Sequence, residues 1–176
     1  MAAPAQSRPL TATRPALLPQ NSDHALRKLL YDFFTVGGRL EEIRRQLAAR
    51  IRLSGPQFTI LTAIGELEGT TGASVGQVAE YLHVTQSFIT IEARKLAQQA
   101  YILKKPDSKD RRVCRLRVSR KGRSSLESLV PLLQRVNDVV FDLESRRQFE
   151  MLCATFDRLV ESSARASALM NSGVKA

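Results

Sequence analysis

Residues 74–118 decide the fold, and they read SVGQVAEYLHVTQSFITIEARKLAQQAYILKKPDSKDRRVCRLRV. Ser74 and Gln77 have the spacing of a capping box, in which each side chain bonds a backbone amide at the start of a helix. Thr85 begins a second helix that runs to about Gln99, and only a short turn separates the two helices. Two helices joined in this way cross steeply, which is the helix-turn-helix arrangement.

A β-hairpin is predicted directly after this helix pair. Beyond Tyr101 the spacing of apolar residues changes from that of a helix to two, the period of a strand. A strand that begins at Ile102 is followed by a turn at 106–110 and by a returning strand at 113–118. The returning strand alternates apolar residues with arginines. An arginine-bearing hairpin after a helix-turn-helix is typical of a wing.

The second helix of the pair is expected to read DNA. Ile89, Ala93 and Leu96 fall on one side of it, which leaves the other side exposed. The major groove presents donors, acceptors and thymine methyl groups to a helix. Ile91 can contact such a methyl group, the alternative being that it packs beside Phe88. The residues predicted to contact DNA from this helix are Thr85, Gln86, Ser87, Thr90, Ile91, Arg94 and Lys95.

The tip of the wing is expected to contact DNA through basic side chains. A guanidinium suits the narrow minor groove, whose negative potential attracts it. Asp110 would repel phosphate, so we expect it to bond Arg112 and fix its direction. A solvated hairpin without a partner is the alternative. The predicted wing contacts are Lys109, Asp110, Arg111, Arg112 and Arg115.

Positive charge is concentrated in the same stretch of the chain. The 176 residues carry 27 Lys and Arg against 17 Asp and Glu, a formal net charge of +10. Residues 85–123 contain twelve of the basic and three of the acidic residues, which amounts to +9. A merely solubilising surplus would be spread more evenly. The sequence therefore indicates a patch for a polyanion, nucleic acid first.

Other classes of protein fit the sequence poorly. No apolar run reaches the ~18 residues of a spanning helix, and two cysteines suit a reducing cytoplasm. His24 and His83 lie far apart, and the sequence has neither a glycine-rich phosphate loop nor a metal-binding Cys/His spacing. We therefore expect no enzyme, no cofactor and no metal site. Cys114 and Cys153 are expected to pack as small hydrophobic residues, with a redox role left open.

Long apolar stripes flank the predicted DNA-binding lobe. Apolar residues recur at three- and four-residue spacing from Ser22 to about Ala49 and again after the wing. The stripes are longer than the lobe needs for its own core, which indicates a homodimer. Gly37-Gly38 interrupts the first stripe and marks a kink, a close approach of a backbone or ligand, or a break between two helices. The predicted division is a flexible arm (1–21), an N-terminal dimerisation helix (22–52), a winged helix-turn-helix lobe (53–121), C-terminal dimerisation helices (122–170) and a tail (171–176).

The wing and the residues after it resemble the MarR family of bacterial winged-helix regulators. The wing of that family reads Asp-x-Arg, several residues of strand, then Leu-Thr-x-x-Gly. This chain has Asp110-Arg111-Arg112 and then Val118-Ser119-Arg120-Lys121-Gly122. Val118-Ser119 departs from Leu-Thr but keeps an apolar strand end and a hydroxyl cap. The resemblance extends over about 23–169, and the order of helices matches.

The resemblance implies a mainly α fold with a small β-wing. It also implies a homodimer in which the first and the last two helices interleave, with both recognition helices on a pseudo-palindromic operator. Repression would be relieved by a small ligand, and the segment 88–96 resembles a subgroup tied to aromatic-acid catabolism, so an aromatic acid or its coenzyme A thioester is expected. A nonspecific architectural DNA- or RNA-binding protein is the alternative function. The effector pocket of the family would fall at Tyr31, Phe34, Gly38, Phe58 and Leu61, each with core packing as the alternative.

Overall fold

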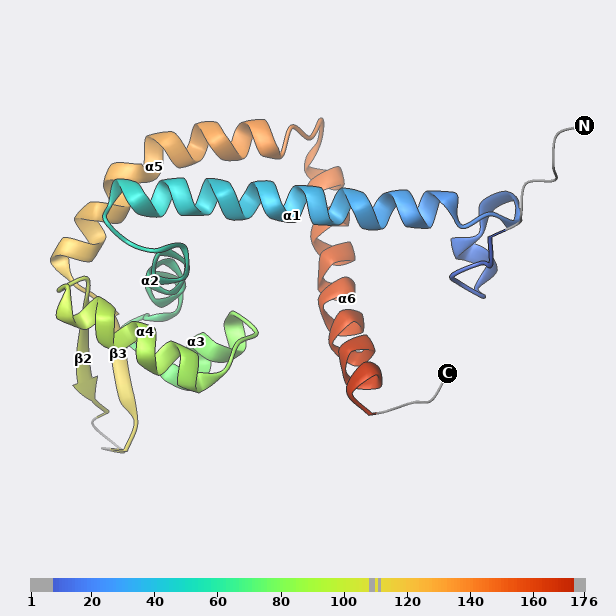
Figure 1. Cartoon of the computed structure of the whole chain (residues 1–176). Coiled ribbons are helices and arrows are strands. Elements are labelled where there is room, and N and C mark those ends of the chain that lie inside the picture. Colours follow the sequence, from blue (N-terminus) through green and yellow to red (C-terminus); the bar gives the residue numbers. More distant parts are fainter. Residues whose placement is uncertain (1–7, 108–109, 111, 173–176) are drawn as a thin grey trace, which may run out of the picture. The chain divides into compact units, whose positions relative to one another are not determined.

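The computed structural model describes residues 8–107, 110 and 112–172 (Figure 1). The described residues form helices and one small sheet, so the predicted fold class, mainly α with a small β-wing, is confirmed. The chain divides into two compact units between Leu129 and Val130. The elements are α1 (His24–Arg50), α2 (Gly55–Leu67), β1 (Ala73–Ser74), α3 (Val75–Tyr81), α4 (Gln86–Gln98), β2 (Ile102–Pro106), β3 (Cys114–Val118), α5 (Arg120–Val140) and α6 (Arg146–Asn171).

The sheet has three antiparallel strands in the order β1-β3-β2. The predicted hairpin is β2 and β3, with Ile102 opposite Val118 and Lys105 opposite Arg115. The short strand β1, in which Ala73 pairs with Leu116, was not predicted. Two residues are too few to show the alternation by which a strand is found in a sequence.

Side-chain caps fix where the helices of the lobe begin. The Ser54 hydroxyl accepts a bond from the backbone of Gln57, whose side chain accepts one from the Ser54 amide in return. Ser74 and Gln77 form the predicted capping box in the same way, at 3.1 and 2.9 Å. The Thr85 hydroxyl accepts from a backbone amide in the first turn of α4. A cap of this kind is worth about 1 kcal/mol.

The core of the lobe is made where α2, α3, α4 and the sheet meet. Each fully buried aliphatic side chain contributes roughly 1.5–3 kcal/mol. The Tyr101 hydroxyl adds a buried bond of 2.5 Å to the carbonyl of Ile51. This core holds one face of α4 and leaves its other face outward. Its largest fully buried side chains are Ile60, Leu61, Ile64, Val78, Ile89, Leu96, Ile102 and Leu116.

Helix α1 is continuous from His24 to Arg50, so a break between two helices at Gly37-Gly38, one of the expected alternatives, is wrong. A Cβ added at Gly37 or at Gly38 would meet nothing within 4 Å. Within the part of the chain that the structure describes, no backbone or side chain of another element therefore approaches the two glycines. Two glycines cost a helix about 2 kcal/mol relative to two alanines, and good helix formers follow them at Arg39, Leu40 and Glu41.

The second unit exposes most of its apolar surface. Helix α6 has no buried residue, and Phe149, Met151 and Phe156 are among its exposed side chains. Cys153 is exposed as well, so the expectation that it packs inside is wrong for the single chain. Cys114 is half-buried on the wing. No helix among the described residues is both long and apolar enough to cross a membrane.

Residues 8–21, expected as a flexible arm, are held against the start of α1. They form two 3-10 turns, η1 (Pro15–Leu17) and η2 (Pro19–Asn21). The carboxylate of Asp23 accepts bonds from the hydroxyl and the backbone amide of Thr11, at 2.7 and 2.9 Å. Arg27 bonds the same carboxylate and the carbonyl of Pro9. Asp23 is the N-cap residue of α1, but its side chain anchors the arm and makes no capping bond to the helix.

We expect acid to release this arm. The Thr11 hydroxyl and amide, together with Arg27, lower the pKa of Asp23 from 3.8 to about 2. A lowered carboxyl pKa means that the stabilisation is complete above pH 3.8 and is lost as the pH falls towards 2. An NMR titration of the Asp23 carboxyl should show this midpoint. Thr11→Ala should move the pKa back towards the ordinary value, and an unmoved pKa would mean that Thr11 is not the cause.

Candidate nucleic-acid interface

The outward face of α4 carries the side chains that the sequence predicted there. Gln86, Ser87, Thr90 and Arg94 are all exposed. Ile91 is 55% exposed, so it does not pack away beside Phe88. A large aliphatic side chain among polar neighbours on an exposed helix is what contact with a thymine methyl group requires. The geometry of α4 fits the predicted reading face.

Three of the residues predicted on α4 have partners within the chain, and one of them is Thr90, whose hydroxyl donates to the carbonyl of Gln86 at 2.9 Å. Thr85 is the N-cap of the helix, and Lys95 Nζ bonds the carboxylate of Glu92 at 2.7 Å. Among the described residues, the side chain of Arg94 has neither a hydrogen bond nor an ion pair and is free to meet a base or a phosphate. The amide of Gln86 lies over Gly76 on α3, at 3.6 Å from where a Cβ would stand.

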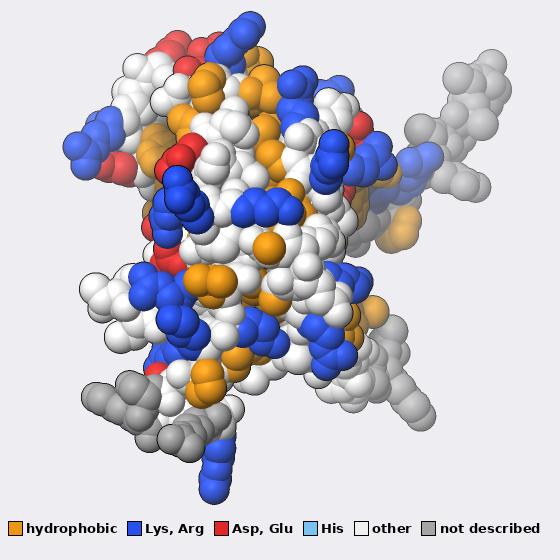
Figure 2. All heavy atoms as spheres, turned by 90° about the vertical axis from the view of Figure 1, so that its left-hand side faces the viewer, with side chains coloured by type: hydrophobic (Ala, Val, Ile, Leu, Met, Phe, Trp, Pro, Cys, Tyr) orange, Lys and Arg blue, Asp and Glu red, His pale blue; other side chains and the backbone are white. Residues whose placement is uncertain are grey.

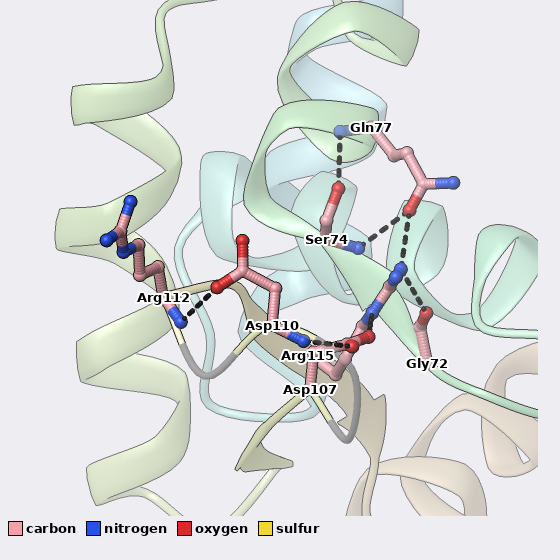
Figure 3. A network of polar contacts seen from close by, with 7 residues as sticks. All are labelled: Gly72, Ser74, Gln77, Asp107, Asp110, Arg112 and Arg115. Atoms are coloured by element: carbon pink, nitrogen blue, oxygen red, sulfur yellow. Dashed lines mark hydrogen bonds and ion pairs between the residues drawn. The ribbon is translucent and has the colours of Figure 1, made fainter.

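The tip of the wing presents Arg112 to solvent. Lys109 and Arg111, which were predicted to contact DNA with it, lie outside the described residues. Asp110 Oδ1 accepts a bond of 2.9 Å from the backbone amide of Arg112. The predicted link between these two residues is therefore present, but it fixes the backbone. The guanidinium of Arg112 has no partner among the described residues (Figure 3).

Arg115, which was predicted to contact DNA from the wing, is bonded within the chain. Its side chain is half-buried, and Nε donates to Asp107 Oδ2 at 2.6 Å. Its Nη1 lies 3.4 Å from the carbonyl of Gly72 and 3.3 Å from Gln77 Oε1 (Figure 3). Sequence reasoning counted Arg115 as a free cation because an ion pair with a residue eight positions away leaves no local pattern.

Several other cations of the basic stretch are also committed to the fold. Arg117 bonds the carbonyl of Thr70, Lys121 lies over the ring of Tyr101, and Arg123 pairs with Glu68. The surface of the lobe nevertheless stays basic, as Figure 2 shows on one side of the molecule. The exposed cations of the stretch with no bonded partner among the described residues are Arg94, Lys104, Lys105, Arg112 and Arg120.

Comparison with known proteins identifies this lobe. The sequence model of the MarR family matches residues 53–113, from the start of α2 to the wing. The lobe belongs to the MarR family. Many solved MarR-family structures share the fold of the chain, and the family is one of transcriptional regulators. No curated protein matches the sequence.

Three solved structures illustrate the similarity of fold. A MarR protein from Peptoclostridium difficile is 21% identical, with 78% of this chain and 88% of that one covered and a TM-score of 0.66. MepR of S. aureus in complex with DNA is 16% identical, with 75% and 96% covered and a TM-score of 0.65. The regulator MOSR of M. tuberculosis, also in complex with DNA, is 18% identical, with 76% and 96% covered and a TM-score of 0.59.

The five residues of the expected MarR effector pocket differ in burial. Phe58 and Leu61 are buried in the core of the lobe, in agreement with core packing, the alternative given for them. Tyr31 and Phe34 are 69% and 76% exposed on α1, and Gly38 has open space above it.

Proposed function

We propose that this MarR-family protein is a sequence-specific DNA-binding regulator. One observation carries the proposal: an exposed α4 face with Gln86, Ile91 and Arg94 lies on a lobe whose wing ends in an exposed Arg112. Helix α4 packs against β2, so the reading face and the wing belong to one folded body. An amide, a guanidinium and an aliphatic group can together distinguish bases in a major groove.

The proposed active form is a homodimer on a pseudo-palindromic operator. Leu29, Leu30 and Val36 are exposed on α1, and apolar side chains are exposed along α6. Exposed apolar stripes of this length on a folded protein mark an interaction surface. A second copy of the chain would cover them and would bring two α4 helices to one duplex. Two-fold symmetric dimers read half-sites about one helical turn apart.

Once an operator has been selected from random duplexes, substitutions should separate residues that recognise its base sequence from residues that increase affinity for any duplex. We expect Arg112→Ala to weaken binding to every duplex about tenfold and to lower the salt slope by about one unit. Arg94→Ala and Gln86→Ala should instead reduce the preference for operator over random DNA about tenfold. Arg14→Ala removes one exposed charge outside the lobe and is the control, with no change expected. Fluorescence anisotropy at several salt concentrations measures all four variants.

The alternative function, a nonspecific architectural DNA- or RNA-binding protein, predicts a different result. Operator and random duplex would then bind with equal affinity, and Arg94→Ala would act only through charge. Structured RNA that bound better than any duplex would also contradict the proposed function.

The finer part of the proposal is repression relieved by an aromatic acid or its coenzyme A thioester. Its support is the family resemblance, and the dimer rather than the single chain would have to form the pocket. A thermal-shift screen of both compound classes, followed by operator release, tests it. A ligand that stabilises the protein while leaving its affinity for DNA unchanged would contradict this part alone.

A further inference from the structure

Arg115 joins the base of the wing to the first turn of α3 (Figure 3). Its Nε bonds Asp107 at 2.6 Å, and its Nη1 reaches the Gly72 carbonyl and Gln77 Oε1. The side chains of Arg115 and Asp107 are 26% and 13% exposed, so water screens the pair only in part. Charge-assisted hydrogen bonds of this kind are about twice as strong as neutral ones.

The same hydrogen-bond chain continues to the tip of the wing. Asp107 uses Oδ2 for Arg115 and Oδ1 for the backbone amide of Asp110, at 3.1 Å. Asp110 in turn accepts from the backbone amide of Arg112 at 2.9 Å. The two oxygens of Asp107 thus connect the anchored Arg115 with the turn that carries Arg112.

The other end of this series of hydrogen bonds is fixed to helices α3 and α4. Gln77 Oε1 accepts from the Ser74 amide as part of the α3 cap, in addition to its contact with Arg115. Gly72 lies close against β3 with φ +90, and a Cβ there would stand 3.0 Å from the carbonyl oxygen of Leu116. Because α3 packs on α4, the residues at this end of the hydrogen-bond series are fixed relative to α4.

We propose that Arg115 is a positioning residue that holds the wing at a set place relative to α3 and α4. This inference rests on the proposed function, because it assigns Arg115 to DNA binding through Arg112. The expected role differs from a phosphate contact, since Nε and Nη1 of the guanidinium are already bonded to three acceptors within the chain. A wing held in place before binding loses less conformational entropy when Arg112 meets the groove.

Two substitutions distinguish positioning from charge. Arg115→Lys keeps the positive charge, but one ammonium cannot reproduce the spread of bonds that the guanidinium makes. Asp107→Asn removes a negative charge that repels DNA, but its single carbonyl oxygen cannot serve both Arg115 and Asp110. We expect each variant to bind operator about tenfold more weakly. Charge alone predicts unchanged binding for the first and tighter binding for the second.

A double-mutant comparison tests whether the effect passes through Arg112. In the Arg115→Lys background, Arg112→Ala should cost about twofold to threefold instead of about tenfold, because the arginine is no longer held in place. The loss of operator preference caused by Arg94→Ala should be the same in both backgrounds. A general loss of folding would reduce both effects together. Arg14→Lys, at an exposed arginine outside the lobe and its basic stretch, is the matched control, with wild-type affinity expected.

A readout without DNA keeps this inference separate from the proposed function. Hydrogen exchange at the backbone amides of Asp110 and Arg112 should be faster in Arg115→Lys than in the wild type, and unchanged in Arg14→Lys. Unchanged exchange together with wild-type affinity in Arg115→Lys would overturn the positioning role. Failure of the wild-type protein to bind any duplex would overturn the proposed function. Faster exchange in Arg115→Lys would still support the positioning role of Arg115.

Discussion

Replacing Gly122 by alanine should destabilise the protein by about 3 kcal/mol, as for severe overpacking of a core. Gly122 is buried in the first turn of α5, and a Cβ there would lie 2.2 Å from the carbonyl oxygen of Tyr101 and 2.9 Å from Val118. The Tyr101 carbonyl cannot move aside, because it accepts the backbone amide of Ser119 at 2.9 Å. Thermal unfolding followed by circular dichroism should show a midpoint lowered by roughly 6–12 °C.

Gly65→Ala is the matched control for this prediction. Gly65 is also helical, and the nearest atom to its added Cβ would be in Val118 at 3.6 Å, an ordinary contact. Alanine is the better helix former by up to about 1 kcal/mol, so this variant should be at least as stable as the wild type. Equal destabilisation by both substitutions would mean that the contact with Tyr101 is not the reason.

The parts of the fold that depend on local sequence were predictable. Capping residues such as Ser74 with Gln77 act within one helical turn, and the change of apolar period after Tyr101 is visible over a few residues. The exposed face of α4 followed from the same periodicity, because Ile89 and Leu96 mark the buried side. The wing and the reading helix were therefore located from the sequence.

The partners of charged side chains were not predictable in the same way. Arg112 and Arg115 lie three residues apart in one basic run, yet the first is exposed and the second bonds Asp107 and Gln77. Their difference depends on the approach of β3 to Gly72, a contact between segments about forty positions apart in sequence. Charge patterning predicts a basic surface and does not say which cation holds the surface together.

Glu68 presents the second large effect that we expect. Its carboxylate is buried at the end of α2 and accepts the backbone amide of Val118 at 2.6 Å and Arg123 Nη2 at 2.5 Å. Glu68→Ala would leave the Val118 amide without an acceptor in the interior, which costs about 1–3 kcal/mol in addition to the lost packing. We expect the free energy of unfolding, measured with urea, to fall by about 2–3 kcal/mol.

The two bonds of Glu68 should contribute unequally to the free energy of unfolding, and three variants show which of them contributes more. The side chain of Arg123 is 55% exposed, so water replaces most of what its ion pair provides, and Arg123→Ala should cost under about 1 kcal/mol. Glu68→Gln keeps an oxygen for the Val118 amide and should resemble Arg123→Ala rather than Glu68→Ala. If Arg123→Ala cost as much as Glu68→Ala, the ion pair would be the main bond. The expected order instead makes the buried carboxylate an acceptor for the backbone, which fixes the end of β3 where α5 begins.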